Sequence, residues 1–304
     1  MIVPYNPFTI FNNARVIKLL YEEFFMGNVI TVANQKGGVA KTATCRYFAD
    51  ICVSMGKKVL LIDFDPQASL TKGFGLNPEL FEGVNEGNIC NIFQQETVSV
   101  IDVGDKDEIL HLMPSNRELG IVGQSNIIGI DLMLRKFMKK NRLSDVYDVI
   151  IIDNNPKFDT MTINTILASN IIVTPVVTSK DEQEGLHGFF KNTEETLSTF
   201  DHSIKKMVII PSRYNKSTKV SKEYLSIIQE DTIPFLKEEC PTISEAEMLV
   251  TSPVPEKVAF PDASSYNLSV YKYLTMYSSE SSMKKDKREK LVSLLEKIVN
   301  VIIK

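Results

Sequence analysis

Two lysines flank a pair of glycines where an apolar, β-branched stretch gives way to a helix-forming segment. Shortly after residues 29–33, the chain reads Lys36, Gly37, Gly38, Val39, Ala40, Lys41 and Thr42. Glycines allow backbone N–H groups to approach oxyanions, and a helix that begins at residue 41 presents its positive end to them. The pattern therefore predicts a nucleotide-binding loop, in which Lys41 reaches the β- and γ-phosphates and the Thr42 hydroxyl binds Mg²⁺.

Carboxylates that could complete this site follow two further apolar stretches. Asp63 and Asp65 stand at the end of the stretch 59–63, and alternation along a strand puts them on the same side of the chain. Asp153 ends the apolar run 149–152. Ligands of doubly wound folds bind at the carboxyl ends of the strands, where these side chains are expected. Phosphoryl transfer needs mostly positioning and charge neutralisation, so such carboxylates need not be strong bases.

The loop departs from the strict P-loop pattern, which requires glycine where Gln35 and Ala40 stand. With its early Lys36, it resembles the deviant form found in the ParA/MinD group of ATPases, and the resemblance covers residues 26–275. At Ala40, where the family has glycine, a Cβ costs little if φ is negative and about 1–2 kcal/mol if φ is positive. Ala43 replaces a threonine whose hydroxyl would face the α-phosphate, although its backbone N–H remains.

The resemblance implies a role for each site residue. Lys36 would cross to the phosphates of a second protomer, and Asp65 would orient the attacking water. Asp63 would support the Mg²⁺ shell, and Asp153 would hold a Mg²⁺-bound water. The catalytic residues implied are thus Lys36, Lys41 and Asp65, and the metal site consists of Thr42, Asp63 and Asp153. After Asp153 the family usually has Cys or Thr and two prolines, whereas this chain has Asn154, Asn155 and Pro156.

Two later segments resemble the parts of ParA proteins that approach the base. They are residues 209–215 and 254–267, and they add Ser212, Arg213 and Pro255 to the nucleotide-binding residues of the loop. A DNA-contacting arginine is common in the family where Ala259 stands, and Lys257 is the nearest basic residue. Residues 201–222 carry six basic side chains against Asp201 alone. With the cluster 284–290, these segments supply the candidate DNA contacts Lys216, Lys219, Lys222, Lys257, Lys284 and Lys285.

The order of elements predicts an α/β fold, a doubly wound and mostly parallel sheet with helices on both faces. We expect strands at 29–33, 59–63, 109–113, 149–153, 171–174 and 207–210. Helices are expected at 42–55, 127–142, 159–169, 184–199, 219–229 and 284–303, and residues 230–265 are predicted to be irregular. Residues 1–26 are interpreted as an extension with a short helix, ahead of a single ATPase domain over 27–304. Met26 is a candidate alternative start.

The composition favours a cytoplasmic protein. The chain has 304 residues, 43% of them apolar, and a net charge of −4. It contains no apolar run of the roughly 20 residues that span a bilayer, and no leader pattern at its start. Four cysteines without paired spacing are interpreted as reduced core thiols.

The resemblance favours an ATPase of plasmid or chromosome partition. It would use ATP and Mg²⁺, form a homodimer on ATP binding, bind DNA non-specifically and associate with the nucleoid. A centromere-binding, ParB-like partner would stimulate an otherwise slow hydrolysis. Two alternatives remain: a MinD-like membrane-cycling ATPase, whose amphipathic helix 284–303 would lie on a bilayer, and a nucleotide-gated regulator with little turnover. We prefer packing of that helix on the sheet, and no membrane partner is expected.

Overall fold

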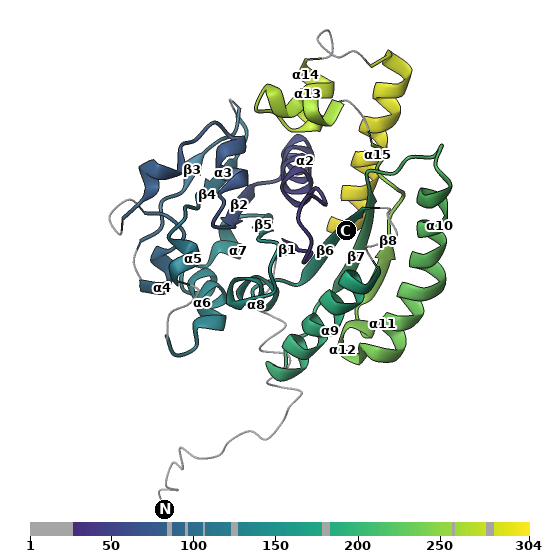
Figure 1. The fold of residues 1–304 in the computed structure, drawn as a ribbon. Helices are drawn as coiled ribbons and strands as arrows, with labels where there is room; N and C mark the ends of the chain where they lie inside the picture. Colours follow the sequence, from purple (N-terminus) through teal and green to yellow (C-terminus); the bar gives the residue numbers. More distant parts are fainter. Residues whose placement is uncertain are drawn as a thin grey trace, which may run out of the picture.

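An eight-stranded sheet forms the middle of the protein (Figure 1). The structure is a computed structural model, and it describes residues 27–83, 87–94, 97–105, 107–122, 127–177, 183–256, 259–277 and 283–304. The strands lie in the order β3-β4-β2-β5-β1-β6-β7-β8. All neighbours pair in parallel except β3 and β4. Their bounds are β1 Asn28–Val32, β2 Val59–Phe64, β3 Ile101–Asp102, β4 Leu110–Met113, β5 Val149–Asn154, β6 Ile171–Val177, β7 Lys206–Ser212 and β8 Glu247–Val250. The predicted fold class is confirmed.

Helices cover both faces of the sheet, because successive strand residues point to opposite sides. One face carries side chains such as Ile30, Leu61 and Ile151. It packs on α2 (Lys41–Ser54), α14 (Val270–Met276) and α15 (Lys285–Ile303). The opposite face packs on α4 (Asn91–Gln94) and α6 (Met133–Lys140), and further along the sheet on α9 (Gln183–Thr199) and α10 (Lys219–Ile227). Figure 1 shows these two layers on either side of the strands.

The carboxyl ends of the central strands meet at one edge of the sheet. In the register of the parallel pairs, Val32 lies opposite Asp153, and Asp63 lies opposite Asp153 on the other side. The loop that follows β1 therefore begins beside two carboxylates that are 90 residues apart in sequence. Open α/β sheets bind their ligands outside the carboxyl ends of the strands, at the point where the strand order reverses.

Two sequence-based expectations about elements are wrong. The helix predicted over 127–142 is a 3₁₀ turn, η3 (Ile130–Leu132), followed by α6 and the short α7 (Leu143–Val146). The segment predicted to be irregular continues as helix through η5 (Ile228–Thr232) and α11 (Ile233–Glu239). Pro234 is accommodated at the start of α11 because the π-helical turn η5 before it already interrupts the α-helical hydrogen bonds. It also includes β8, an edge strand without alternation of burial. Further short helices are α3 (Ser69–Gly73), η1 (Pro78–Phe81), α5 (Leu119–Val122), α8 (Thr160–Leu167), α12 (Pro241–Ser244) and α13 (Ala259–Ser265).

The last helix packs on the sheet, as the sequence favours. Its apolar stripe lies in the same core as α2 and consists of Leu291, Leu295, Ile298, Val299 and Ile302. None of the described helices is long and apolar enough to cross a membrane. The short helix predicted in residues 1–26, Met26 included, falls outside the described residues, and the proposed domain boundary at residue 27 stays a prediction.

Candidate nucleotide-binding site

The loop between β1 and α2 is held by a buried asparagine. Asn34 donates from Nδ2 to the carbonyl of Pro175 (2.9 Å), and its Oδ1 accepts the N–H of Lys36 (2.9 Å). Both Gly38 (φ 77°) and Ala40 (φ 75°) adopt the left-handed conformation. The sequence left the sign of φ at Ala40 open, and the structure gives a positive φ. Alanine is therefore strained here by about 1–2 kcal/mol relative to glycine.

Lys41 points back into the hollow of this loop. Its Nζ donates to the carbonyls of Lys36 (3.0 Å) and Asn34 (3.2 Å), and 8% of the residue is exposed. Burial lowers the pKa of Lys41, and the charges of Asp153 and Asp65 oppose that shift. Lys36 itself is exposed at the mouth of the loop. The two lysines thus occupy different places, one inside the loop and one on the surface.

Thr42 and Asp153 form the part of the site that suits a metal ion. The Thr42 hydroxyl donates to Oδ2 of Asp153 (2.6 Å). The buried Oδ1 of Asp153 has no hydrogen-bond partner among the described residues, and the thiol of Cys45 lies against the same carboxylate. Burial and the negative charge of Asp63 raise the pKa of Asp153, so a cation here would be favourable.

The donor set fits Mg²⁺ rather than a metal held by protein alone. Among the described residues, no three His, Cys, Asp or Glu side chains cluster as a metal site. Mg²⁺ characteristically takes one or two protein ligands, together with waters and phosphate oxygens. The hydroxyl of Thr42 and the carboxylate of Asp153 match that pattern.

Asp63, which the sequence places in the Mg²⁺ shell, accepts hydrogen bonds from the protein through both of its carboxylate oxygens. Its Oδ2 accepts the N–H (2.8 Å) and the hydroxyl (2.7 Å) of Thr71, and its Oδ1 accepts the N–H of Asp65 (3.3 Å). Asp65 is less buried, and its Oδ1 accepts the N–H of Gln67 (2.8 Å). Burial raises the pKa of both carboxyl groups. The metal role of Asp63 stays a prediction, while its contacts link it to the backbone of Asp65.

The two asparagines that replace the usual family residues form a polar turn after β5. Asn154 donates to the Thr162 hydroxyl (3.1 Å), and Asn155 donates to Asp159 (3.2 Å). Asp159 in turn caps α8 by accepting the N–H of Met161 (3.0 Å). The sequence reasoning missed this network, together with Asn34 and Thr71, because short polar side chains of this kind are common in turns.

The predicted base-binding residues line one cavity of about 330 Å³ beside the loop. It is formed by the start of α2, the end of β7 and residues 254–256 and 260–261; its residues include Gly38, Ala40, Ala43, Tyr47, Ser212, Arg213, Pro255, Glu256 and Phe260. Arg213 reaches Glu256 (3.6 Å) across the cavity mouth, and its Nη1 lies 3.5 Å from the carbonyl of Gly38. All three base-site residues expected from the sequence, 212, 213 and 255, thus meet the loop.

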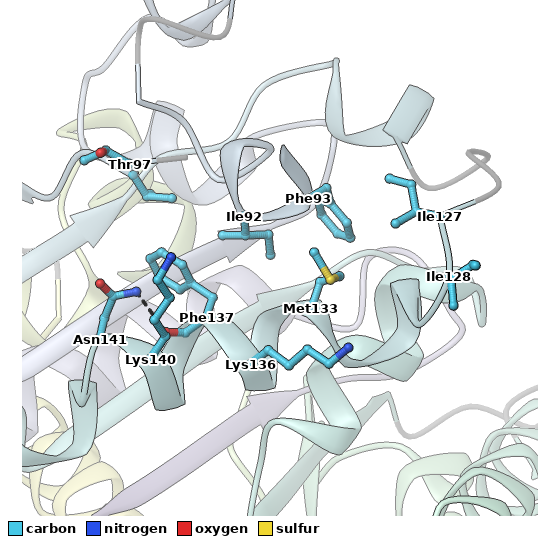
Figure 2. Close-up of a pocket in the computed structure, with 11 residues that line it drawn as sticks. Ile92, Phe93, Thr97, Ile127, Ile128, Met133, Lys136, Phe137, Lys140 and Asn141 are labelled. Atoms are coloured by element: carbon cyan, nitrogen blue, oxygen red, sulfur yellow. Dashed lines mark hydrogen bonds between the residues drawn. The ribbon is translucent and has the colours of Figure 1, made fainter. Parts of the chain in front are cut away.

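A larger hollow of about 430 Å³ lies between α4 and α6, on the opposite face from α2 (Figure 2). Phe93 stands on one side of it and Met133 on the other, with Lys136 and Lys140 along α6. The residues that line it in the described part of the chain include no glycine and no carboxylate. It therefore lacks the glycine loop and the candidate metal-binding carboxylate of the cleft beside α2.

The candidate DNA contacts are on the surface where they can be described. Lys216 is exposed in the turn before α10, and Lys219 and Lys222 are exposed at the start of α10. Lys284 and Lys285 are exposed at the start of α15. Two of them make surface ion pairs, Lys219 with Glu223 (3.3 Å) and Lys285 with Glu289 (3.9 Å). Lys257 falls outside the described residues. Exposure is compatible with DNA binding but is equally typical of a solvated face.

Comparison with known proteins adds family membership to this geometry. The AAA domain family matches residues 27–206, which is more than half of the chain. The chromosome-partitioning ATPase Soj of Thermus thermophilus is 29% identical over 195 residues, which span 64% of this chain and 72% of Soj. The family match over residues 27–206 includes the loop and the strands that end in the candidate carboxylates.

Solved structures share the fold. A plasmid partition protein from Borrelia burgdorferi, bound to AMPPNP, superimposes with a TM-score of 0.65 at 24% identity, covering 91% of this chain and 99% of that one. A cobyrinic acid a,c-diamide synthase from Mycobacterium smegmatis, with an ATP analogue and magnesium, gives 0.67 at 20% identity, covering 90% and 93%. Since proteins with different activities share this fold, the likeness to them supports the architecture alone.

Proposed function

This chain belongs to the AAA domain family, in its ParA-type group of partition ATPases, and from that premise we propose that it segregates DNA as an ATP-gated dimer. Each protomer would bind one ATP in the cleft formed by residues 34–42 and the base cavity. The observation that carries the proposal is the meeting of Lys41, the Thr42–Asp153 pair and the 330 Å³ cavity at one edge of the sheet.

The cleft residues divide the work of hydrolysis. Bound Mg²⁺ would neutralise phosphate charge, and Thr42 and Asp153 are the side chains that would hold it. Lys41 would exchange two backbone carbonyls for phosphate oxygens, which are stronger acceptors. Asp65 would orient the attacking water, a role in which position matters more than basicity. Phosphate release measured with and without EDTA tests the requirement for a divalent cation.

Lys36 would complete the site of the partner protomer. It is exposed at the mouth of the loop, whereas Lys41 is turned inward. We expect Lys36→Ala to bind ATP with modest loss yet to remain monomeric in light scattering with ATP. Lys36→Arg is the matched control, because it keeps the charge. A Lys36→Ala dimer of normal stability would contradict the role in trans.

Non-specific DNA binding would use the exposed lysines of α10. Phosphate contacts carry no sequence information, and each one releases counterions, so binding should be lost between about 50 and 200 mM salt. We expect Lys216→Glu with Lys219→Glu to abolish binding of unrelated duplexes by the ATP-bound protein, with ATP affinity unchanged. The matched control is Lys136→Glu with Lys140→Glu, which alters the net charge equally on α6. If the DNA affinity of the α10 variant kept the same dependence on salt concentration, these lysines would be only solvent-exposed charges. The 284–290 cluster would then be tested next.

A nucleotide-gated regulator with little turnover is the second candidate. The observation in its favour is the strained Ala40, in the loop that must wrap the phosphates. The rate of phosphate release, with and without a ParB-like partner from the same replicon, separates the two. A MinD-like membrane cycle has less support, because the apolar stripe of α15 is buried against the sheet. Vesicle flotation with ATP tests it directly.

A further inference from the structure

A closed circuit of hydrogen bonds surrounds the backbone of Asp65. The N–H of Asp65 donates to Oδ1 of Asp63 (3.3 Å), and Oδ2 of Asp63 accepts the Thr71 hydroxyl (2.7 Å). The same Thr71 oxygen accepts the N–H of Ser115 (3.1 Å). The Ser115 hydroxyl then donates to the carbonyl of Asp65 (2.9 Å), which closes the circuit on the residue where it began.

The donors and acceptors of this circuit are matched. Thr71 has one hydroxyl proton, which it gives to Asp63, and a lone pair that takes the Ser115 N–H. Ser115 gives its one hydroxyl proton to Asp65. Asp63, Thr71 and Ser115 are each 0% exposed, so solvent cannot replace a lost partner. They come from β2, α3 and the residue pair after β4, which are thereby tied to one another.

The circuit holds Asp65 by its main chain and leaves its carboxylate outside. The N–H of Asp65 donates to Asp63, and its C=O accepts the Ser115 hydroxyl in addition to the N–H of Ala68 (2.8 Å), while its side chain accepts only the Gln67 N–H among the contacts described. Misplacing a water-orienting group by about 1 Å can cost a hundredfold in rate. A rigid peptide on both sides is therefore the property that such a carboxylate requires.

We propose that Thr71 and Ser115 are positioning residues for hydrolysis, which act through Asp63 and the main chain of Asp65. This rests on the proposed function, in which Asp65 orients the attacking water. Neither residue reaches the nucleotide cavity. Their loss should lower kcat while the affinity for nucleotide is kept, because Lys41, Thr42 and the base cavity lie outside the circuit.

The test measures phosphate release, nucleotide affinity and thermal stability of the full chain. We expect Ser115→Ala to lower kcat about tenfold, the rate equivalent of one hydrogen bond, with nucleotide Kd within about twofold of the parent. Thr71→Val should do the same, and Thr71→Ser should restore most of the rate because it keeps the hydroxyl. Ser169→Ala is the matched control: it removes a buried hydroxyl bonded to the Thr165 carbonyl (2.6 Å) away from Asp65. It should lower stability as Ser115→Ala does, and leave kcat unchanged.

Two outcomes separate this inference from the function on which it rests. Parental turnover in Asp65→Ala would overturn the role of Asp65 itself. If Asp65→Ala abolishes turnover while Ser115→Ala and Thr71→Val behave like Ser169→Ala, the circuit is only structural and the inference is wrong. In the Asp65→Ala background, adding Ser115→Ala should change the residual rate no further. An additional tenfold loss there would show that Ser115 acts by another route.

Discussion

Two charge clusters lie along helix α2, and each combines three carboxylates with one half-buried or buried lysine. The first, the phosphate cluster, consists of Lys41, Asp63, Asp65 and Asp153 at the start of the helix. The second, the α14 cluster, joins Asp50 in the middle of α2 to Lys272 of α14 and to Asp105 and Glu108 in the turn between β3 and β4. The composition is the same, but the contacts differ.

The lysine of the α14 cluster touches its carboxylates. Lys272 Nζ lies 2.8 Å from Asp105, 3.4 Å from Glu108 and 3.8 Å from Asp50. Burial alone would lower the pKa of Lys272, but these carboxylates outweigh it and the pKa is raised. The Ser269 hydroxyl donates to Asp50 as well and caps α14 by accepting the N–H of Lys272 (3.1 Å). The lysine therefore contacts all three carboxylates within the protein, and these contacts hold α14 against α2.

The lysine of the phosphate cluster has no carboxylate within ion-pair distance among the described residues. Its Nζ bonds to two main-chain carbonyls, and Oδ1 of the buried Asp153 has no hydrogen-bond partner in the part of the chain that the structure describes. A folded chain tolerates such unmatched groups where a ligand will supply the missing charge. Burial and composition therefore do not distinguish a ligand-binding site from a structural ion-pair cluster. The distinction lies in whether the opposite charges meet.

The largest expected effect concerns Asp65 of the phosphate cluster. We expect Asp65→Ala to lower the rate of phosphate release at least about 100-fold, because the attacking water loses its orienting group. ATP and Mg²⁺ should still bind, and the dimer should stay on DNA. Asp65→Asn, which can still accept the Gln67 N–H, should lose as much, since the charge is missing. Nucleotide affinity and melting temperature of both variants show whether the fold is intact.

Lys272 should show the opposite behaviour. Lys272→Ala removes the ion-pair partner of the buried Asp50 and leaves it the charge of Arg46, so we expect a loss of about 3 kcal/mol in the free energy of unfolding. Turnover of the folded fraction should change little. Lys285→Ala is the control, because that exposed pair with Glu289 contributes less than about 1 kcal/mol. Urea unfolding and phosphate release on the same samples measure both. If Lys272→Ala lost turnover but kept its stability, the α14 cluster would not be the purely structural cluster that we infer.

The sequence predicts the phosphate cluster because its members stand next to strong local signals. Lys41 follows the glycine loop, and Asp63 and Asp153 end apolar strands, which parallel pairing brings to one edge. The α14 cluster has no such signal. Asp50, Asp105 and Lys272 come from distant segments, and each alone is typical of a solvated surface. Thr71 and Ser115 were missed for the same reason: only tertiary packing brings the Thr71 hydroxyl to Asp63 and the Ser115 hydroxyl to the carbonyl of Asp65.

The pH dependence of stability gives a further measure of the α14 cluster. Burial raises the pKa of Asp50 to about 6 from 3.8, although Ser269 and Lys272 oppose the shift. The folded protein then holds this proton more tightly than the unfolded chain. Stability therefore falls as pH rises from about 4 to about 6, and the cost stays constant above that.

Asp50→Asn removes this titration. The difference in unfolding free energy between variant and parent should shift in favour of the variant by about 2–3 kcal/mol between pH 4 and pH 6.5. His202 has its pKa lowered to about 4 by burial and works in the opposite direction, but it is present in both proteins and cancels. Urea titrations at several pH values measure the difference. A constant difference across this range would show that Asp50 keeps its ordinary pKa.

The smallest effect is expected at Ala40, where the phosphate cluster meets the backbone. A left-handed alanine is strained relative to glycine, although glycine gains entropy in the unfolded chain, so Ala40→Gly should stabilise the protein by about 0.5–1 kcal/mol. Asp201→Gly is the matched control, because Asp201 is also left-handed (φ 47°) but follows α9 and lies outside the loop. Both variants should raise the urea midpoint, and only Ala40→Gly should tighten nucleotide binding or speed phosphate release. Equal effects of both on turnover would mean that strain at Ala40 has no part in setting the rate, and that unmatched charge alone distinguishes this end of α2 from the other.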